Sequence, residues 1–446
     1  MASKREGWGL VITEGAVRGR PSVAYNTWGT KDAIDDGVTG HLAPTMDPTG
    51  LAQAWRETIK SYSHYERVRT AAWKTATKLS STDAADIFLT HAAAIAGLDP
   101  TIAEDRSLPS VSVVIPTLNA GRLLGECLAA IRDQDYPQVK VEILIADGGS
   151  TDDTRTIAKR FKANVFENPL KTGEAGKAVG VKKANNDLIA LIDSDNILVD
   201  RQWLRKMVAP FTEPSIIGSE PLHYQYRPSD GLITRYTALL GMGDPLVLFL
   251  GNYDRYSTLT NRWTDLPIPF QERKGWIDVT LQPPLIPTIG ANGTIFRRSF
   301  LQPALLSTAN DDYLFDIDLL AEVAAKTPVH FAKVKTGIVH VFAGTVAIFA
   351  KKQFRRVRDF LYYQRSGVRS YPWGKTNQWG RIAFILSCLT LVPLLAQALI
   401  GFSRKPDVVW FFHPIAAYVT LITYAYGYLS FQFDPTIASR AGWRQT

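Results

Sequence analysis

Two aspartates separated by a single serine, Asp193 and Asp195, form the segment of the sequence with the clearest chemical potential. Carboxylates at this Asp-x-Asp spacing can share a hard divalent cation through oxygen, although many such pairs only close a turn or cap a helix. A cation held there would neutralise a nucleoside diphosphate that leaves as an anion. Lys171 and Lys177 precede the pair and would add positive charge. The residue types therefore indicate metal-assisted chemistry on a phosphate-containing substrate.

The placement of these aspartates depends on the elements that precede them. Three apolar runs have the length of buried strands, and helical periodicity follows the first two, so the predicted elements are strands at 111–116, 141–146 and 188–192 and helices at 123–131 and 151–162. Strands and helices alternating at this spacing predict βαβ units with a parallel sheet. Ligands bind beyond the carboxyl ends of such strands, so we expect Asp147, Asp193 and Asp195 at one edge.

The composition is that of a folded protein whose charge is concentrated in one segment. The chain has 446 residues, of which 46% are hydrophobic and 21% charged. Its net charge of +8 is carried by 351–381, where Asp359 is the only acid. This segment adjoins apolar runs, so no nucleic-acid partner is predicted. Cys127 and Cys388 lie far apart in sequence and predict neither a disulfide framework nor a zinc site.

Two long uncharged runs follow the basic segment. Residues 382–403 and 408–433 both reach the length of about 20 residues that spans a bilayer core. Buried helices of a soluble core are the alternative. The basic flank predicts that the preceding domain lies on the cytoplasmic side, and the first ten residues lack the apolar region of a signal peptide. We therefore expect a multi-pass membrane protein with two transmembrane helices.

Four blocks in the middle of the chain are similar in order and spacing to those of a known family. They are VVIPTLN, ADGGSTDDT, GKAVGVKKANNDLIALIDSDN and IGANGTIFRRS. Over about 111–345 the chain resembles the family 2 glycosyltransferases, which are inverting, nucleotide-sugar-dependent enzymes. The resemblance implies the GT-A fold, an α/β architecture with a mostly parallel sheet flanked by helices. It also implies a UDP- or GDP-linked sugar donor and a bound Mg²⁺ or Mn²⁺.

The resemblance assigns roles to individual residues. The base pocket would be lined by Pro116 and Thr117, the nucleoside contacted by Asp147, the ribose or phosphates by Asp193, and the metal held by Asp195 and His340, with Lys177 near the phosphates. His340 lies between apolar residues, so a buried structural histidine is its alternative role. Ala120 stands where relatives often carry glutamate, which leaves the details of base recognition open.

An inverting transfer also needs a base that removes the proton of the acceptor hydroxyl. In relatives this base is an aspartate in a late acidic block, and the segment FDIDL at 315–319 occupies the corresponding place. Asp316 is therefore expected to be the base. Asp311, Asp312 and Asp318 are alternatives, because Phe315 replaces an acid of the block, and a helix-capping role for Asp316 is another.

Residues 346–381 form a basic segment between the predicted catalytic domain and the apolar runs. Processive members of the family carry Gln-x-x-Arg-Trp, whereas Gln353 and Arg356 are followed here by Val357, so a processive polymerase is not expected. Within 346–364 the apolar residues share one helical face opposite basic residues. This pattern predicts an interfacial helix on an anionic membrane surface.

The first 98 residues, which precede a polar linker at 99–109, resemble a different family. The spacing of Glu6 and Glu14 is similar to that in the nucleotide-sugar-binding half of family 4 glycosyltransferases, which have the GT-B fold. The sequence lacks counterparts of the acceptor-binding domain and of the opening strands of the donor domain. We therefore expect a partial Rossmann-like remnant, or one half of a split enzyme whose sheet edge a partner would cover.

Together these features predict a membrane-anchored inverting glycosyltransferase with its catalytic domain at 110–345. It would move a sugar from a nucleotide-diphosphate donor to a membrane-associated acceptor such as a lipid-linked glycan. A polyprenyl-phosphate sugar synthase is an alternative with the same donor chemistry. An inactive, membrane-tethered scaffold that binds nucleotide-sugar is an alternative of another class, against which the complete set of aspartates argues.

Overall fold

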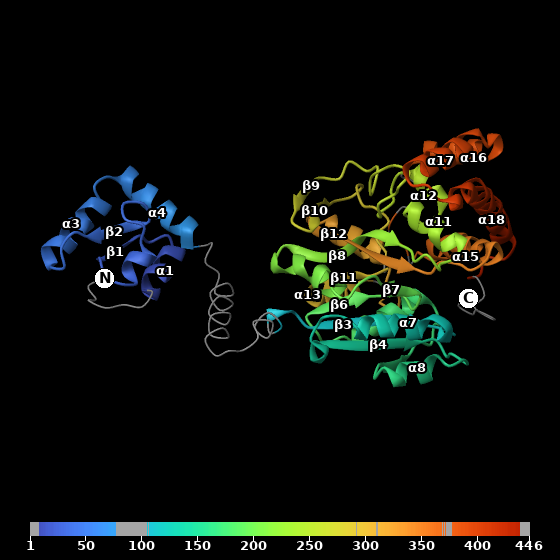
Figure 1. Ribbon diagram of the computed structural model, residues 1–446, viewed down its shortest axis with the longest axis horizontal. Helices are drawn as coiled ribbons and strands as arrows, with labels where there is room; N and C mark the ends of the chain where they lie inside the picture. The colour runs from blue at the N-terminus through green and yellow to red at the C-terminus, as the bar shows by residue number, and fades with distance from the viewer. Residues whose placement is uncertain are drawn as a thin grey trace. The chain divides into compact units, whose positions relative to one another are not determined.

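The computed structural model describes residues 9–76, 105, 107–290, 292–308, 311–367, 369, 371 and 377–437, and the chain forms two compact units, 1–107 and 108–446 (Figure 1). In the first unit a parallel pair of strands packs against helices; its elements are α1 (Leu10–Val17), β1 (Ser22–Tyr25), α2 (Thr30–Ala33), β2 (Gly40–Ala43), α3 (Pro48–Thr58) and α4 (Tyr62–Ala76). Its core is small and includes Val23, Tyr25, Ala43 and Ala54. Glu6 and most of the predicted linker lie outside the described residues.

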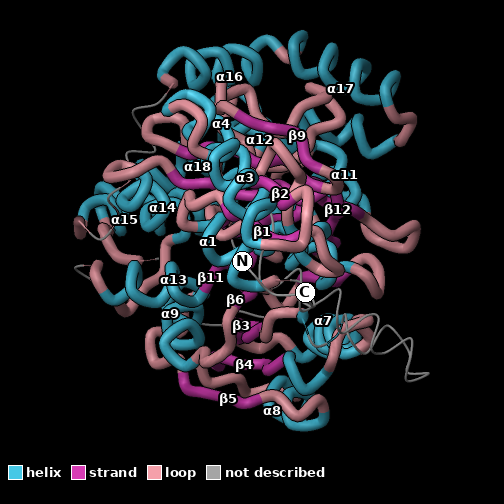
Figure 2. The backbone as a smooth tube through the Cα atoms, turned by 90° about the vertical axis from the view of Figure 1, so that its left-hand side faces the viewer, coloured by secondary structure: helices cyan, strands magenta, loops and turns pink. Residues whose placement is uncertain are grey.

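The second unit is built on a large sheet with the strand order β5-β4-β3-β6-β11-β8-β12-β10-β9, and β7 pairs with β12. Figure 2 shows β5, β4, β3, β6 and β11 following one another in this order. The strands are β3 (Val111–Thr117), β4 (Val141–Asp147), β5 (Asn164–Glu167), β6 (Leu188–Leu191), β7 (Asn196–Leu198), β8 (Ile216–Gln225), β9 (Phe270–Arg273), β10 (Trp276–Leu281), β11 (Thr294–Arg297) and β12 (Val329–His340). The three strands predicted from apolar runs are thus confirmed as β3, β4 and β6.

The sheet is mixed rather than mostly parallel, although β8 and β12 pair in parallel beyond β6. Strands β3, β4, β5 and β6 pair in parallel, but β11 lies antiparallel between β6 and β8. At the far edge, β9 and β10 form an antiparallel hairpin through Gly275, which has a φ of 85°. A hairpin needs only a short turn, whereas parallel pairing needs a crossover connection, so the second half of the domain departs from the βαβ pattern.

Helices cover both faces of this sheet. They are α7 (Gly121–Arg132), α8 (Thr154–Arg160), α9 (Gly173–Lys183), α10 (Trp203–Val208), α11 (Leu232–Leu240), α12 (Pro245–Leu250), α13 (Arg298–Leu306) and α14 (Asp316–Ala324), with short 3₁₀ turns η1 (Gln138–Lys140) and η2 (Ala209–Thr212). Both predicted helices are present, as α7 and α8. Along β3, Val113 and Ile115 join the core under α7 and α10, whereas Val114 joins the core under α9 and α14. Strands buried on both faces explain the uninterrupted apolar runs in the sequence.

The chain ends in a group of helices that packs beside α11 and α12. Its elements are α15 (Val346–Arg365), α16 (Gln378–Thr390), α17 (Val392–Arg404), η3 (Val408–Phe412) and α18 (His413–Phe433). Within the described residues, Val408–Phe433 is the one continuous helical stretch long and apolar enough to cross a membrane. The other predicted span, 382–403, is not one straight helix, because α16 and α17 meet at 93°. Leu391 has a φ of 60° at the break, and Pro393 in the first turn of α17 has no amide hydrogen with which to continue α16.

Helix α15 also differs from its prediction. The apolar residues expected to face a membrane pack on α18 instead, where Phe354 stacks on Tyr426 at 5.5 Å and Val357 lies against Gly427. The two helices can approach closely here because glycine has no side chain; a Cβ on Gly427 would meet Val357 at 2.4 Å. Helix α15 therefore lies between α18 and the interior of the second unit.

Candidate active site

A cavity of about 710 Å³ opens at the carboxyl ends of β3 and β6. Its lining includes the end of β3, the first turns of α9, the Asp193–Asp195 turn after β6 and one face of α15. This is the edge at which an open α/β sheet is expected to bind ligands. Residues far apart in the sequence therefore meet around one space.

The Asp-x-Asp segment forms a tight turn between β6 and β7. The amide of Asn196 donates to the carbonyl of Asp193 at 2.9 Å, and the side-chain oxygen of Asn196 accepts from the amide of Asp193 at 3.1 Å. The amide of Val341, just beyond β12, donates to the carbonyl of Asp195 at 2.9 Å. The backbone of the turn is thus fixed, and both carboxylates line the cavity.

Two lysines and a histidine lie near these carboxylates. The Lys177 Nζ lies 3.8 Å from Oδ1 of Asp193, while His340 Nε2 and Lys352 Nζ each lie 3.7 Å from a carboxylate oxygen of Asp195. Burial opposes ionisation of Asp195, but His340 and Lys352 outweigh it and lower the pKa of Asp195 to about 2. Burial raises the pKa of Asp193, an effect that Lys177 partly offsets. Asp195 is thus an anion across the physiological pH range.

The predicted base-pocket residues also line the cavity, at the end of the strand that pairs with β6. Pro116 and Thr117 end β3 and line the cavity beside the first turns of α9. Gly176 makes this arrangement possible, because a Cβ at this position would meet the Pro116 Cβ at 2.7 Å. Thr172 begins α9 by accepting a hydrogen bond from the amide of Ala175 at 3.1 Å.

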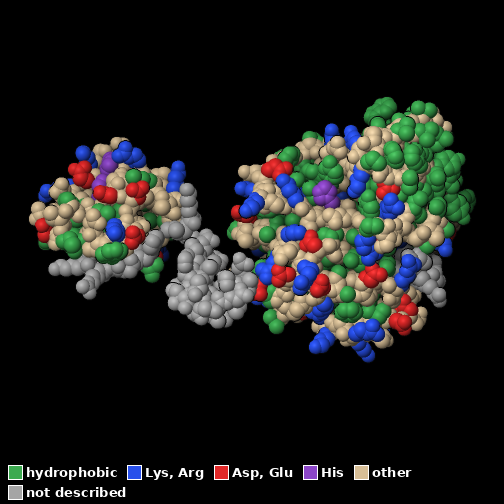
Figure 3. Space-filling model, in the orientation of Figure 1, with side chains coloured by type: hydrophobic (Ala, Val, Ile, Leu, Met, Phe, Trp, Pro, Cys, Tyr) green, Lys and Arg blue, Asp and Glu red, His purple; other side chains and the backbone are tan. Residues whose placement is uncertain are grey.

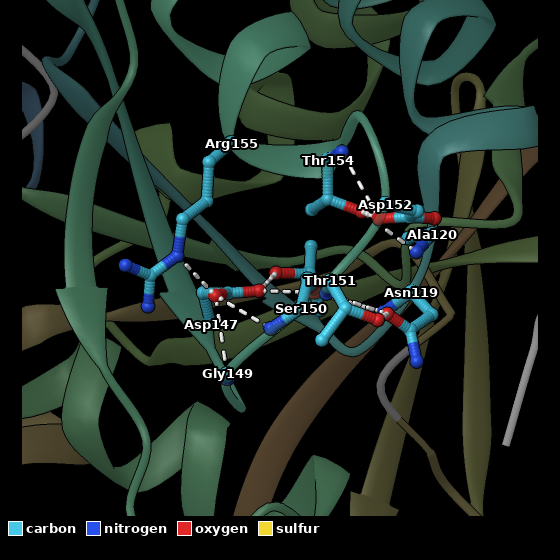
Figure 4. Close-up of polar contacts among 10 residues, drawn as sticks. Asn119, Ala120, Asp147, Gly149, Ser150, Thr151, Asp152, Thr154 and Arg155 are labelled. Atoms are coloured by element: carbon cyan, nitrogen blue, oxygen red, sulfur yellow. Dashed lines mark hydrogen bonds and ion pairs between the residues drawn. The ribbon is translucent and has the colours of Figure 1, made fainter. Parts of the chain in front are cut away.

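Asp147 ends β4 as predicted, but its carboxylate does not line the cavity. It is buried and accepts a hydrogen bond from Thr117 Oγ1 at 3.0 Å. It also accepts hydrogen bonds from the Ser150 amide at 3.0 Å and from Arg155 Nε at 2.7 Å (Figure 4). Burial raises the pKa of Asp147, yet the hydrogen bonds from Ser150 and Arg155 outweigh that effect and hold the pKa below its ordinary value. In this structure Asp147 therefore organises the loop that follows β4.

Asp316, the predicted base, is the first residue of α14 and is 8% exposed. Its Oδ1 is buried and accepts no hydrogen bond from the residues that the structure describes. Burial raises the pKa of Asp316 to about 6, against the opposing effect of Lys177. Lys177 and Asp193 act electrostatically on Asp316, which is not itself among the residues that line the cavity, whereas its neighbour Phe315 is.

The alternative carboxylates are held by other partners. Lys182 Nζ lies 3.0 Å from Asp311 and 3.7 Å from Asp312. Asp318 accepts two charge-assisted hydrogen bonds from Arg369, at 2.6 and 2.7 Å, and one from the amide of Tyr371. Asp318 thereby ties the segment after α15 to α14. Among these four aspartates, only Asp316 has a buried carboxylate oxygen without a partner.

Two family models match the chain. The model described as Glycosyl transferase family 2 matches residues 112–277, and the model described as Glycosyl transferases group 1 matches residues 1–75. Residues 112–277 are thus similar to family 2 glycosyltransferases. Residues 1–75 are similar to a second glycosyltransferase group, consistent with the likeness inferred from Glu6 and Glu14, of which Glu14 is exposed on α1.

Curated relatives of the family 2 domain are glycosyltransferases. Glycosyltransferase AglE of Haloferax volcanii is 28% identical over 30% of this chain and 47% of its own length. GalNAc(5)-diNAcBac-PP-undecaprenol beta-1,3-glucosyltransferase of Campylobacter jejuni is 27% identical over 21% of this chain and 31% of its own length. The chain thus spans less than half the length of either relative.

Among solved structures, a mannosyltransferase from Pyrobaculum calidifontis in complex with GDP-Man and Mn²⁺ is similar to this chain. It has a TM-score of 0.43 and 18% identity over 77% of this chain and 99% of that one.

The family 2 domain shows no ready-made cluster of three or more His, Cys, Asp or Glu side chains that could hold a metal, within the part of the chain that the structure describes. Asp195 and His340 nevertheless supply one carboxylate and one imidazole on the same wall of the cavity. This donor set suits Mn²⁺, and Mg²⁺ commonly takes only one or two carboxylates while substrate phosphates complete its coordination. The residues present therefore fit a metal that is bound jointly by protein and substrate.

The other end of the cavity was not predicted from the sequence. It is lined by apolar residues of α12, by Arg356 of α15, by Arg381 of α16 and by Tyr424 of α18. Arg356 and Gln353 both donate to the carbonyl of Gly243, at 3.3 and 2.7 Å. The Gln-x-x-Arg spacing in the sequence marked these two side chains, but it did not indicate that Arg356 would face the cavity that holds the Asp-x-Asp turn.

A buried ion network lies behind Asp254, one of the residues that line the cavity. Glu220 lies 2.5 Å from Lys333 Nζ and 3.0 Å from an Arg255 nitrogen, and all three side chains are fully buried. Arg255 also pairs with Asp254 at 3.3 Å, and Asp254 lines the cavity. The members of this network lie on separate strands and loops, so no local sequence pattern predicted it.

Proposed function

We propose that the chain is a metal-dependent, inverting glycosyltransferase that moves a sugar from a UDP- or GDP-linked donor to a membrane-associated acceptor, a lipid-linked glycan. The observation that carries this proposal is the meeting of Asp193, Asp195, Lys177 and His340 around one cavity at the carboxyl ends of the strands. The family 2 match and the glycosyltransferase relatives support the same reaction class.

The donor would lie with its base near Pro116 and Thr117 and its diphosphate near Asp193 and Asp195. Asp195 and His340 would hold Mg²⁺ or Mn²⁺, which when bound supplies positive charge to the departing diphosphate. Lys177, fixed beside Asp193, adds a second positive charge on the same side. Because these charges are preorganised in a partly enclosed cavity, they stabilise the leaving group more than solvated charges would.

Asp316 would accept the proton of the acceptor hydroxyl at its carboxylate. A pKa of about 6 leaves this group ionised at neutral pH while making it more basic than an exposed aspartate. Among the described residues, none donates a competing hydrogen bond to its buried Oδ1. Attack from this side and departure of the nucleotide from the other would invert the anomeric centre.

The acceptor would enter from the end of the cavity formed by α12, α16 and α18. This end combines apolar residues with Arg356 and Arg381, which matches a substrate with a lipid chain and a phosphate. Arg381 lies on a helix whose other side chains, such as Ile385 and Leu386, are exposed and apolar. The Campylobacter jejuni relative is named for an undecaprenol-linked glycan.

The same basic side chains favour a second candidate function, a polyprenyl-phosphate sugar synthase. Its acceptor is already an anion and needs little help from a base. In that case Asp316→Asn would reduce turnover only slightly, whereas the glycan transferase would lose most of its turnover.

A donor screen tests the proposal. The detergent-solubilised chain is incubated with UDP- and GDP-sugars, with and without Mn²⁺, and nucleotide release is measured. We expect release from at least one donor, dependent on the metal and absent in Asp195→Ala, with Asp312→Asn as a control that keeps activity. Metal-independent release, or release that survives Asp195→Ala, would contradict the proposed site.

A further inference from the structure

The helices α16, α17 and α18 present a broad apolar surface to the outside of the second unit. Figure 3 shows hydrophobic side chains gathered where Figure 1 labels these helices. Exposed members of this surface include Ile385, Leu389, Leu395, Leu399, Ile415 and Ile422. Soluble surfaces rarely expose so many large apolar side chains together, so this one indicates a lipid contact.

We propose that this surface enters a single leaflet of an anionic membrane and that α18 lies along the membrane plane, so that the chain is monotopic. This inference concerns the mode of membrane binding and goes beyond the proposed reaction. It rests on the positions along α18 at which charged side chains of the rest of the second unit contact this helix.

Polar contacts bind α18 to the catalytic unit near both of its ends. Just before α18, Asp407 accepts a hydrogen bond from Arg235 at 2.5 Å, and His413 in its first turn pairs with the Tyr236 hydroxyl at 2.7 Å. Near its other end, Arg358 of α15 donates to Ser430 at 3.3 Å. Arg235 and Tyr236 belong to α11, and Arg358 belongs to α15. Other helices of the second unit therefore contact α18 near both of its ends.

Charged groups also contact α18 at its middle. Tyr424 donates a 2.5 Å hydrogen bond to Asp244, and Arg356 lies 3.6 Å from the same carboxylate. If α18 crossed the bilayer, its middle would lie at the bilayer centre and would take Asp244 and Arg356 there. Charged side chains at that depth are costly, and α15 would bring Lys352 and Arg355 with them.

Helices α16 and α17 are each too short to cross. Each has 13 residues, and at about 1.5 Å per residue each is about 20 Å long, against a hydrocarbon core of about 30 Å. Their 93° bend prevents them from acting as one straight helix. A bent pair with exposed apolar side chains suits insertion into one leaflet, as amphipathic interfacial helices do.

The exposed face of α18 has the pattern of a helix lying flat. Ile415, Ile422 and Leu429, spaced seven residues apart, are 52%, 52% and 59% exposed. Residues on the opposite side of α18, such as Ala416 and Thr420, are buried within the second unit. One stripe therefore faces outward along the whole helix, and basic residues next to the apolar surface, such as Arg404 and Lys405, suit anionic headgroups.

Depth measurements along this stripe test the proposal. Single cysteines replace Ile415, Ile422 or Leu429, carry an environment-sensitive fluorophore, and are quenched by spin-labelled lipids in vesicles of phosphatidylcholine and phosphatidylglycerol. We expect similar, shallow depths at all three positions. Val139→Cys, at a position that is 97% exposed on η1, is the control that stays in water. The unsubstituted protein, whose Cys127 and Cys388 are buried, gives the labelling background.

A second measurement reports which side of the membrane each end of α18 occupies. Cysteines replacing Lys405 and Pro435, which are both exposed, are treated with an impermeant maleimide after the protein is added to sealed vesicles. The proposal predicts that both are labelled from outside. It would be overturned by protection of one end, by a depth maximum at Ile422, or by no quenching at any of the three positions. Neither readout uses activity, so both results are independent of the proposed reaction.

Discussion

Replacement of Asp316 by Asn tests the chemical step directly. The substitution keeps the shape of the side chain and removes its ability to accept a proton. Because Asp316 is not among the residues that line the cavity, we expect nucleotide-sugar binding to persist. Base catalysis typically contributes about 10²- to 10⁴-fold, so kcat should fall by that factor, which equals about 3 to 5 kcal/mol of transition-state stabilisation.

The pH dependence gives a second signature of the same residue. Burial raises the pKa of Asp316 to about 6, so the carboxylate is about 90% ionised at pH 7 and about 10% at pH 5. Only the ionised form accepts a proton, so the wild-type kcat should fall about tenfold over this interval. In Asp316→Asn this acidic limb should disappear from the residual activity.

Steady-state kinetics and donor titration of Asp316→Asn and of a control variant test whether Asp316 is the base. Asp312→Asn is the matched control, because Asp312 is nearby in sequence, is exposed and pairs with Lys182. It should keep kcat, KM and the acidic limb. The reasoning would be refuted if Asp316→Asn turned over at a near-normal rate with the wild-type pH profile, or if it lost donor affinity rather than turnover.

Three further predictions concern the donor site and the fold. Asp195→Ala should abolish the gain in donor affinity that Mn²⁺ provides, measured by calorimetry, and an unchanged gain would exclude Asp195 as a metal ligand. Lys177→Met removes a charge that lowers the pKa of Asp316, so the acidic limb of kcat should move to higher pH. An acidic limb that stays in place would show that Lys177 does not act on the group that titrates. Gly180→Ala should destabilise the domain by about 1 to 3 kcal/mol in chemical denaturation, because its Cβ would meet Val114 at 2.2 Å, whereas Gly173→Ala, with no atom within 4 Å, should not.

The first half of the catalytic domain could be predicted from the sequence because its signals are local. The apolar runs that became β3, β4 and β6 are buried on both faces, and the helix after β3 shows one apolar face. A parallel arrangement then sends Asp193 and Asp195 to one edge by topology alone. For this reason the Asp-x-Asp turn was placed correctly without any knowledge of tertiary contacts.

The remainder depends on contacts that the sequence does not announce. The antiparallel insertion of β11 follows from pairing with β6 and β8, which lie far from it along the chain. Lys352 comes to Asp195 only because α15 folds back over the cavity, and its basic neighbours indicated only a solvated or membrane face. The break at Leu391 could not be predicted because the residues on both sides of it are apolar, and hydropathy does not indicate the direction of a helix axis.

Calorimetry with UDP- and GDP-sugars, in the presence and absence of Mn²⁺, tests the central claim most directly. The account predicts a saturable heat with at least one donor that requires the metal and is lost in Asp195→Ala. An absence of heat with every donor tested, or equal heat with and without metal, would contradict a cavity built to bind a metal-chelated sugar nucleotide.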